Sequence, residues 1–201
     1  MCIRDRKRLV DIVISGAGLI ALAPMFLAIA AIIKLTSPGP VFFSQPRFGR
    51  KNELFQIYKF RTMHVDNLDP SGVMQTTDND PRITPFGGFL RRTSLDEFPQ
   101  LLNVLIGDMS LVGPRPHVPG MMAGDILYEQ LVPEYYARHA IRPGITGLAQ
   151  IKGFRGSTVD PERARCRISC DLTYIENAKL ALDVWILIET VRREFLFGNG
   201  S

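Results

Sequence analysis

Two adjacent carboxylates, Asp96 and Glu97, lie in the segment "SLDEFPQ". Neighbouring residues on a helix point about 100° apart, so the pair does not share a proton on one face. The two suit separate tasks, in which one carboxylate attacks and the other holds a cation. The spacing from Ser94 to Glu97 also fits a capping box, in which both side chains bind free amides at a helix start. Spacing alone favours the capping box.

Pro99 shifts the expected helix start. After a cap at Ser94, the proline would be the fifth helical residue and would delete an intrahelical hydrogen bond. After a cap at Asp96 it is the third residue, whose N–H has no helical partner to lose. We therefore expect the helix to begin at Asp96, where its positive end stabilises an anion.

Arginines stand close to this pair in the sequence. Arg91 and Arg92 precede it, and Arg115 lies between two prolines. A planar guanidinium suits phosphate groups. A plain salt bridge is the default for any single pair, so the case for chemistry depends on the whole set.

The composition limits the class of protein. The chain has 201 residues, of which 46% are hydrophobic and 22% charged, which is enough for one ordinary domain with a short appendage. A formal charge of +4 suggests an acidic partner such as phosphate, nucleic acid or an anionic membrane. The cysteines lack CxxC spacing and indicate neither a disulfide framework nor a zinc site: Cys2, Cys166 and Cys170. The histidines are too dispersed for a ligand set: His64, His117 and His139.

The run from Ile12 to Ile33 contains no charged residue and is long enough to cross a bilayer. Pro24 lies near its middle, where it bends or breaks a helix. A re-entrant helix-break-helix fits this proline and the basic residues on both flanks, which are each typical of the cytoplasmic side. A straight span and a buried core helix remain alternatives. The basic flanks are Arg4, Arg6, Lys7 and Arg8 before the run, and Lys34, Arg47, Arg50 and Lys51 after it.

The rest of the chain predicts a mostly helical α+β domain over 37–201, following a basic flank and membrane segment over 1–36. The expected elements are a β-hairpin within 41–63, a long loop over 66–88, a helix over 101–106 closed by Gly107, irregular chain over 110–120, helical patterns over 121–140, a break at 142–147 and an amphipathic helical stretch over 169–196. The opening "MCIRDR" receives no functional weight.

The chain resembles the bacterial sugar transferase family of monotopic phosphoglycosyl transferases in the order and spacing of three blocks. These are "GPVFFSQPRFGRKNELFQIYKFRTM" (39–63), "DPRITPFGGFLRRTSLDEFPQLLNVLIGDMSLVGPRP" (80–116) and "RPGITGLAQIKG" (142–153). The match extends to "KRLVDI" (7–12) and "DLTYIEN" (171–177), and so covers nearly the whole chain. One departure is Ala23-Pro24, where many relatives have Ser-Pro.

The resemblance implies a membrane-embedded enzyme that moves a sugar 1-phosphate from a UDP-sugar to undecaprenyl phosphate and releases UMP, the first committed step of an exopolysaccharide, capsule or O-antigen. It assigns Asp96 as a nucleophile that forms a covalent phosphosugar intermediate, and Glu97 as a partner of Mg²⁺. Arg91 and Arg115 are the first candidates for the diphosphate and the uridine side, followed by Lys59 and Arg61. Asp171 matches a recurrent acid of the family and is a further binding candidate, with a structural role left open.

The family also implies a place at the bacterial inner membrane, in contact with lipid and with the catalytic domain facing the cytoplasm. We expect longer relatives that carry additional spanning helices upstream. A homodimer is compatible with this interpretation. Two other functions remain open. One is a membrane-tethered phosphate-binding or scaffold protein, which would not need the pair Asp96 and Glu97, called the dyad below. The other is a metal-dependent phosphohydrolase with water as acceptor. Nucleic-acid binding is not expected, because the basic residues are scattered and the aromatic residues lie mostly in apolar patterns.

Overall fold

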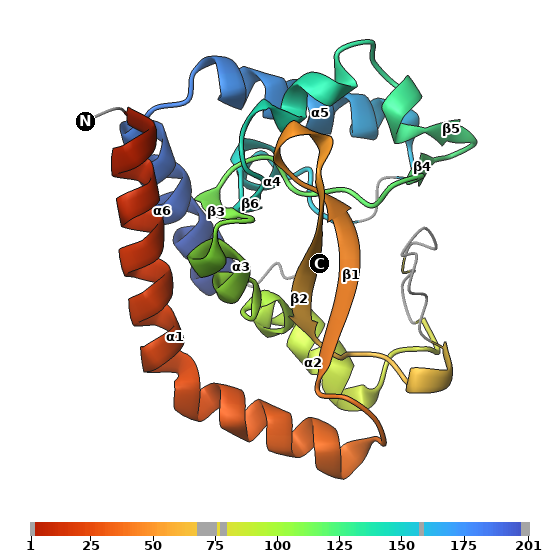
Figure 1. Cartoon of the computed structure of the whole chain (residues 1–201). Coiled ribbons are helices and arrows are strands. Elements are labelled where there is room, and N and C mark those ends of the chain that lie inside the picture. Colours follow the sequence, from red (N-terminus) through yellow and green to blue (C-terminus); the bar gives the residue numbers. More distant parts are fainter. Residues whose placement is uncertain (1–2, 68–75, 77–79, 157–158, 198–201) are drawn as a thin grey trace.

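The computed structural model describes residues 3–67, 76, 80–156 and 159–197, and every structural statement concerns this part of the chain (Figure 1). The α-helices are α1 (Ile3–Thr36), α2 (Pro85–Arg92), α3 (Gln100–Ile106), α4 (Leu148–Ile151), α5 (Pro161–Glu176) and α6 (Leu180–Phe197). Short 3-10 helices are η1 (Arg50–Asn52), η2 (Val65–Asn67), η3 (Leu95–Glu97), η4 (Tyr128–Gln130) and η5 (Tyr135–Ala140). The strands are β1 (Phe42–Phe48), β2 (Leu54–Phe60), β3 (Ser110–Val112), β4 (Met122–Ala123), β5 (Ile126–Leu127) and β6 (Gly144–Thr146).

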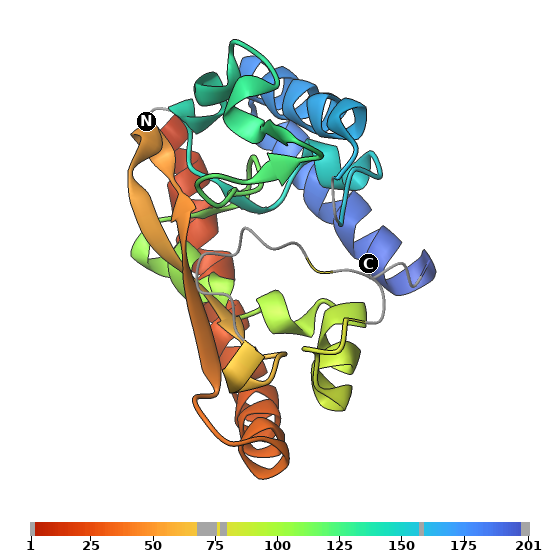
Figure 2. The ribbon, with the colours of Figure 1, turned by 90° about the vertical axis from the view of Figure 1, so that its right-hand side faces the viewer.

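The expected β-hairpin is present as β1 and β2, an antiparallel pair with Ser44 opposite Tyr58. Lys51 and Asn52 make its turn with φ of 58° and 64°, values that asparagine tolerates better than most residues. The hairpin runs along one edge of the molecule, with α5 and α6 across from it (Figure 2). The prediction from the aromatic and β-branched pattern is confirmed.

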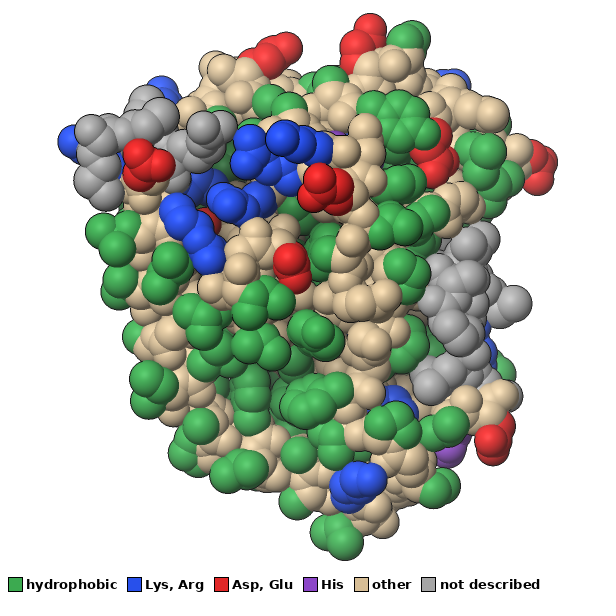
Figure 3. Space-filling model, viewed as in Figure 1, with side chains coloured by type: hydrophobic (Ala, Val, Ile, Leu, Met, Phe, Trp, Pro, Cys, Tyr) green, Lys and Arg blue, Asp and Glu red, His purple; other side chains and the backbone are tan. Residues whose placement is uncertain are grey.

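α1 is a single helix that bends around the rest of the molecule (Figure 1). It continues through Pro24, so the expected helix-break-helix is here a bend within one helix, as a proline inside a helix commonly produces. Ile20 and Leu27 are 79% and 74% exposed. Within the described residues, one helix is long and apolar enough to cross a membrane, over Asp5–Thr36. Hydrophobic side chains cover much of the lower left of the face in Figure 3, where α1 runs.

Both ends of α1 contact the rest of the domain. Near its start, Lys7 Nζ donates to Asp183 at 2.7 Å, and Asp11 accepts from the Leu111 amide at 3.0 Å. Near its end, Ile33 packs in a cluster with Phe60. Lys7, which the sequence predicts as part of a basic membrane flank, thus also makes a tertiary contact.

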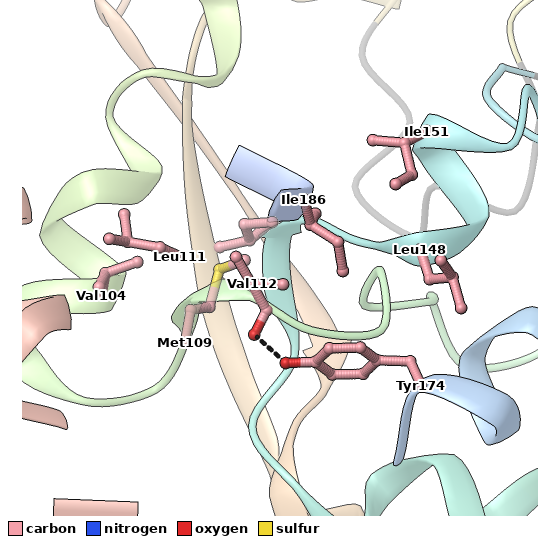
Figure 4. Packing of buried hydrophobic residues seen from close by; sticks show 9 residues of the cluster. Val104, Met109, Leu111, Val112, Leu148, Ile151, Tyr174 and Ile186 are labelled. Carbon is pink, nitrogen blue, oxygen red and sulfur yellow. Dashed lines mark hydrogen bonds between the residues drawn. The ribbon is translucent and has the colours of Figure 1, made fainter. Parts of the chain in front are cut away.

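The main core lies between the parallel pair β3–β6, the hairpin and the C-terminal helices. Tyr174 O–H donates to the Val112 carbonyl at 3.3 Å inside it (Figure 4). Burying such side chains is worth roughly 1.5–3 kcal/mol each. The buried members are Ile57, Val104, Met109, Leu111, Val112, Leu148, Ile151, Tyr174 and Ile186.

Several expected boundaries are corrected. The segment 121–140 contains the β4–β5 pair and two 3-10 helices instead of α-helix, because Gly124 adopts φ 58° and Pro133 interrupts the pattern. The segment 110–120, which was expected to be irregular, begins with strand β3, and β3 pairs in parallel with β6. The stretch 169–196 belongs to two helices, α5 and α6. Helix α2 begins inside the expected loop 66–88, whose middle lies outside the described residues. The helix closed by Gly107, at φ 108°, is confirmed as α3.

Candidate active site

The two carboxylates lie in the 3-10 turn η3, between α2 and α3. Ser94 adopts the left-handed conformation with φ 55° and makes no capping hydrogen bond, whereas a cap requires extended backbone. Helix α3 begins at Gln100, directly after Pro99. Both expectations for the helix start are therefore wrong: no capping box forms, and Asp96 is not the cap. A proline fits best at the entrance of a helix, where it removes no intrahelical bond.

Helix α2 brings Arg91 to the turn. Thr84 caps the helix by accepting from the Gly87 amide at 2.9 Å, and Pro85 occupies its first turn. Gly87 lies directly on the backbone after β2, since a Cβ there would stand 2.0 Å from the Thr62 carbonyl oxygen. This close approach lets Arg91 Nε donate to Thr62 Oγ1 at 2.9 Å.

Glu97 is held by two cations from distant parts of the chain. Lys59 Nζ donates to Oε1 at 2.6 Å, and Arg115 donates to both carboxylate oxygens, at 3.0 Å to Oε2. The side chains of Lys59 and Arg115 remain 20% and 32% exposed. Burial alone would raise the pKa of Glu97, but the charges and hydrogen bonds of Arg115 and Lys59 outweigh it and lower the pKa well below its ordinary value.

Asp96 has a different environment, although it is only 6% exposed. Within the described part of the chain, the hydrogen bonds of Lys59 and Arg115 go to Glu97, and none goes to Asp96. Burial and the charge of Glu97 raise the pKa of Asp96 to about 6, against the charges of Lys59, Arg91 and Arg115. The two carboxylates thus have pKa values moved in opposite directions, as in pairs with separate chemical roles. The carboxylate of Asp96 is therefore more basic than that of Glu97, and it is still ionised at neutral pH.

Two further arginines, Arg155 and Arg47, lie near the turn, and neither was among the site residues expected from the sequence. Arg155 NH2 donates to Ser94 Oγ at 3.3 Å. Burial and the charge of Arg115 lower the pKa of Arg155, against the charges of Glu97 and Asp96. Arg47 donates to the Pro116 carbonyl at 3.3 Å. Both stand inside the matching blocks or next to one, yet no local spacing ties them to the dyad.

The other two predicted site residues lie elsewhere. Arg61 is 2% exposed and donates to the Ser37 carbonyl at 2.9 Å, so it holds the chain that follows α1. Asp171 is 1% exposed and accepts from Arg138 at 2.5 Å. The structure therefore brings Lys59, Arg91 and Arg115 to the dyad, and not Arg61 or Asp171.

The donor set at the dyad fits Mg²⁺ in the way that this ion usually binds. Mg²⁺ takes one or two protein carboxylates and completes its shell with substrate phosphates and water. Asp96 and Glu97 offer two carboxylates, and the described residues contain no cluster of three His, Cys, Asp or Glu side chains that would form a cage of protein ligands. An ion at this place would therefore need the phosphates of a substrate.

Comparisons with known proteins cover nearly the whole chain. The family model for bacterial sugar transferase matches residues 3–196. The exopolysaccharide production protein PSS of Rhizobium leguminosarum bv. phaseoli is 55% identical over 194 residues, which cover 96% of this chain and 97% of that protein.

Two longer relatives have names that state an activity. The undecaprenyl-phosphate glucose phosphotransferase of Komagataeibacter xylinus is 47% identical, and the match covers 96% of this chain but 36% of that protein. The UDP-N-acetylgalactosamine-undecaprenyl-phosphate N-acetylgalactosaminephosphotransferase of Aeromonas hydrophila is 42% identical, with 97% of this chain and 44% of that protein covered. The chain thus spans less than half the length of these two.

Proposed function

The chain belongs to the bacterial sugar transferase family, and on this basis we propose that it transfers a sugar 1-phosphate from a UDP-sugar to undecaprenyl phosphate and releases UMP. One observation carries the proposal. A buried aspartate with a raised pKa lies beside a glutamate held by Lys59 and Arg115, with Arg91 and Arg155 close by. This is a nucleophile in a cationic site, which suits attack on a diphosphate.

In the first step, a carboxylate oxygen of Asp96 attacks the phosphorus next to the sugar. The Asp96–phosphorus bond forms as the bond from that phosphorus to the bridging oxygen breaks, and the electron pair leaves with UMP. A carboxylate needs no general base, because it is already ionised at neutral pH. In the second step, an oxygen of the lipid phosphate attacks the same phosphorus and releases Asp96, which gives the undecaprenyl diphosphate sugar.

The cations stabilise the charge that moves onto the leaving phosphate. Arg115 and Lys59 are half-buried and hold Glu97 in the free protein, so a diphosphate can share their donors without ordering new side chains. Guanidinium groups bind phosphate in a bidentate manner, and we assign the diphosphate to Arg91 and Arg115. Mg²⁺, held by Glu97 with Asp96 adjacent, would neutralise the diphosphate when bound.

We also propose that α1 enters and leaves the membrane by the same face. A straight helix of 34 residues would separate its ends by about 50 Å, more than the bilayer core of about 30 Å. Instead, Lys7 at one end and Ser37 just beyond the other both bind the same domain, so that domain would stand on one side, the cytoplasmic side. The test uses Arg6→Cys and Lys34→Cys, each introduced alone into a chain without its native cysteines. Both cysteines should react with a membrane-impermeant thiol reagent in inverted vesicles. Reaction of the two cysteines from opposite sides of the membrane would contradict the proposal.

The activity is tested by incubating the solubilised protein with undecaprenyl phosphate, Mg²⁺ and a panel of UDP-sugars, and by measuring UMP. The panel should include UDP-glucose and UDP-N-acetylgalactosamine, since both sugars occur in the names of relatives. We expect UMP release that depends on the lipid and is abolished in Asp96→Asn. Sustained turnover without the lipid would indicate a phosphohydrolase, and full activity in Asp96→Asn would indicate that the dyad is structural.

Omission of the metal provides a second test of the site. Treatment with EDTA should abolish UMP release, and added Mg²⁺ should restore it. Binding of the UDP-sugar, measured by calorimetry with and without Mg²⁺, gives a readout that is independent of turnover. Equal affinity and equal activity without the metal would contradict the assignment of Mg²⁺ to this site.

A further inference from the structure

The segment 114–117, which carries Arg115, has no regular structure, yet the backbone carbonyl of each of its residues accepts a hydrogen bond. The Pro114 oxygen accepts from the Gly144 amide at 2.9 Å, and the His117 oxygen accepts from the Phe48 amide at 2.9 Å. Between them, Pro116 accepts from Arg47 at 3.3 Å. Because prolines contribute no N–H, this segment depends on donors from elsewhere to fix its conformation.

The carbonyl of Arg115 itself is held by Arg138, from η5. Arg138 NH2 donates to this oxygen at 2.9 Å and to Asp171 Oδ2 at 2.5 Å, while NH1 lies 2.8 Å from His117 Nδ1. The side chains of Arg138 and Asp171 are 1% and 2% exposed. One guanidinium thus joins α5 to two residues of the segment.

The fork of Arg138 is necessary for this arrangement. A guanidinium presents several donors in one rigid plane, whereas a lysine ammonium is a compact charge on a flexible stem. Arg138 also stabilises neutral His117, whose pKa is lowered well below its ordinary value by burial and then by the charge of Arg138. The imidazole can therefore accept from the guanidinium at Nδ1.

We propose that Arg138, fixed in place by Asp171, is a positioning residue that sets the location of Arg115 and, through it, of Glu97. The inference rests on the proposed function, because its consequence is measured as sugar-phosphate transfer. It also gives Asp171 a role that requires no contact with substrate. Arg138 acts at a distance from the reacting atoms, since its contacts are with the backbone of Arg115 and with buried side chains.

The test is a double-mutant cycle between Arg138→Lys and Arg115→Ala, with UMP release as the readout. A misplacement of about 1 Å can cost about 100-fold in rate. We therefore expect Arg138→Lys to lower kcat/KM by about 10- to 100-fold. In the Arg115→Ala background the same change should cost less than about twofold, because the residue it positions is absent. Arg138→Lys should also divide its effect between kcat and KM in the proportion seen for Arg115→Ala.

Ile186→Ala is the control for lost stability, since Ile186 is fully buried in the main core. Per folded molecule, it should keep kcat/KM within about twofold of the wild type. An equal loss from Arg138→Lys in both Arg115 backgrounds, no loss at all, or a similar loss in Ile186→Ala would overturn the proposal. If Arg138→Lys does not fold, Arg138→Met with Asp171→Leu, which removes both buried charges together, takes its place in the cycle.

A failure of this inference is distinguishable from a failure of the proposed function. The latter would already be visible in wild-type protein that releases no UMP, or in Asp96→Asn that releases it normally. The double-mutant cycle is measured only once the wild type is shown to be active and Asp96→Asn inactive. The coupling energy between Arg138→Lys and Arg115→Ala then reports on the role of Arg138.

Discussion

The turn that carries Asp96 and Glu97 and the group of side chains around Arg138 each contain a buried aspartate. The two aspartates differ in their hydrogen-bond partners. Asp171 is 1% exposed and has a direct hydrogen bond from Arg138. Asp96 is 6% exposed, but the nearby cations donate their hydrogen bonds to Glu97. Burial raises the pKa of both carboxylates, so the difference between them lies in their partners. Asp171 is paired with Arg138 and holds the structure together, whereas Asp96, which lacks such a hydrogen bond, keeps an oxygen available for reaction.

The first consequence is a large loss of stability in Asp171→Asn. Removing one partner of a buried ion pair leaves Arg138 charged and uncompensated, which typically costs about 3 to 5 kcal/mol. For a chain of this size that lowers the unfolding temperature by on the order of 10 °C, measurable by thermal unfolding in detergent. Asp125→Asn is the matched control, since Asp125 is exposed beside the β4–β5 turn. An unchanged unfolding temperature in Asp171→Asn would show that the ion pair is not structural.

The second consequence has the opposite sign. The pKa of Asp96 is raised from 3.8 to about 6, so the folded protein binds more protons than the unfolded chain between these values. Stability contributed by the protonated acid is lost as the pH rises through this window, and at pH 7 the ionised Asp96 destabilises the fold. Asp96→Asn should therefore stabilise the inactive protein at pH 7 by about 1 to 3 kcal/mol.

This gain should disappear when unfolding is measured near pH 4, where wild-type Asp96 is protonated. The comparison with Asp171→Asn is direct, because both variants make the same chemical change at a buried site. If both variants were equally destabilised at pH 7, the two aspartates would have the same role, and the contrast between the regions would be wrong.

Local patterns in the sequence predicted much of the fold. Aromatic and β-branched residues indicated the hairpin, and Gly107 marked the end of α3, because these features depend on neighbours in the chain. The dyad and Arg115 were likewise visible as residue types. What the sequence could not provide is the pairing of Asp171 with Arg138, which are 33 positions apart and meet only in the folded core.

The basic residues in the first turns of α1 show the same limit of prediction from sequence. A lysine that flanks a membrane segment and a lysine that binds a buried carboxylate look alike in a sequence. Lys7 donates to Asp183, and Arg8 to the Val104 carbonyl at 2.6 Å, so part of the expected membrane signal serves the packing of α1. The sequence predicts a break at Pro24, but α1 continues through this residue. A proline restricts a helix, and tertiary contacts decide whether the helix continues past it.

The smallest expected effect is a shift in the pH dependence of kcat/KM. This pH dependence distinguishes the titration of Asp96 from that of Glu97. The kcat/KM for the UDP-sugar reports groups of the free enzyme. It should fall about tenfold per pH unit below about pH 6, because only ionised Asp96 attacks. Glu97 should not contribute to this limb, since its pKa is lowered well below the ordinary value.

Arg91→Gln should move the acid limb to higher pH, because the charge of Arg91 lowers the pKa of Asp96. Arg92→Gln is the matched control, as Arg92 is the next residue and is exposed. Arg91→Gln will also weaken diphosphate binding and lower the rate at every pH, but a uniform loss does not move the midpoint of the limb. A midpoint that stayed in place in Arg91→Gln, or moved equally in Arg92→Gln, would mean that the titrating group is not Asp96 in the environment described for it.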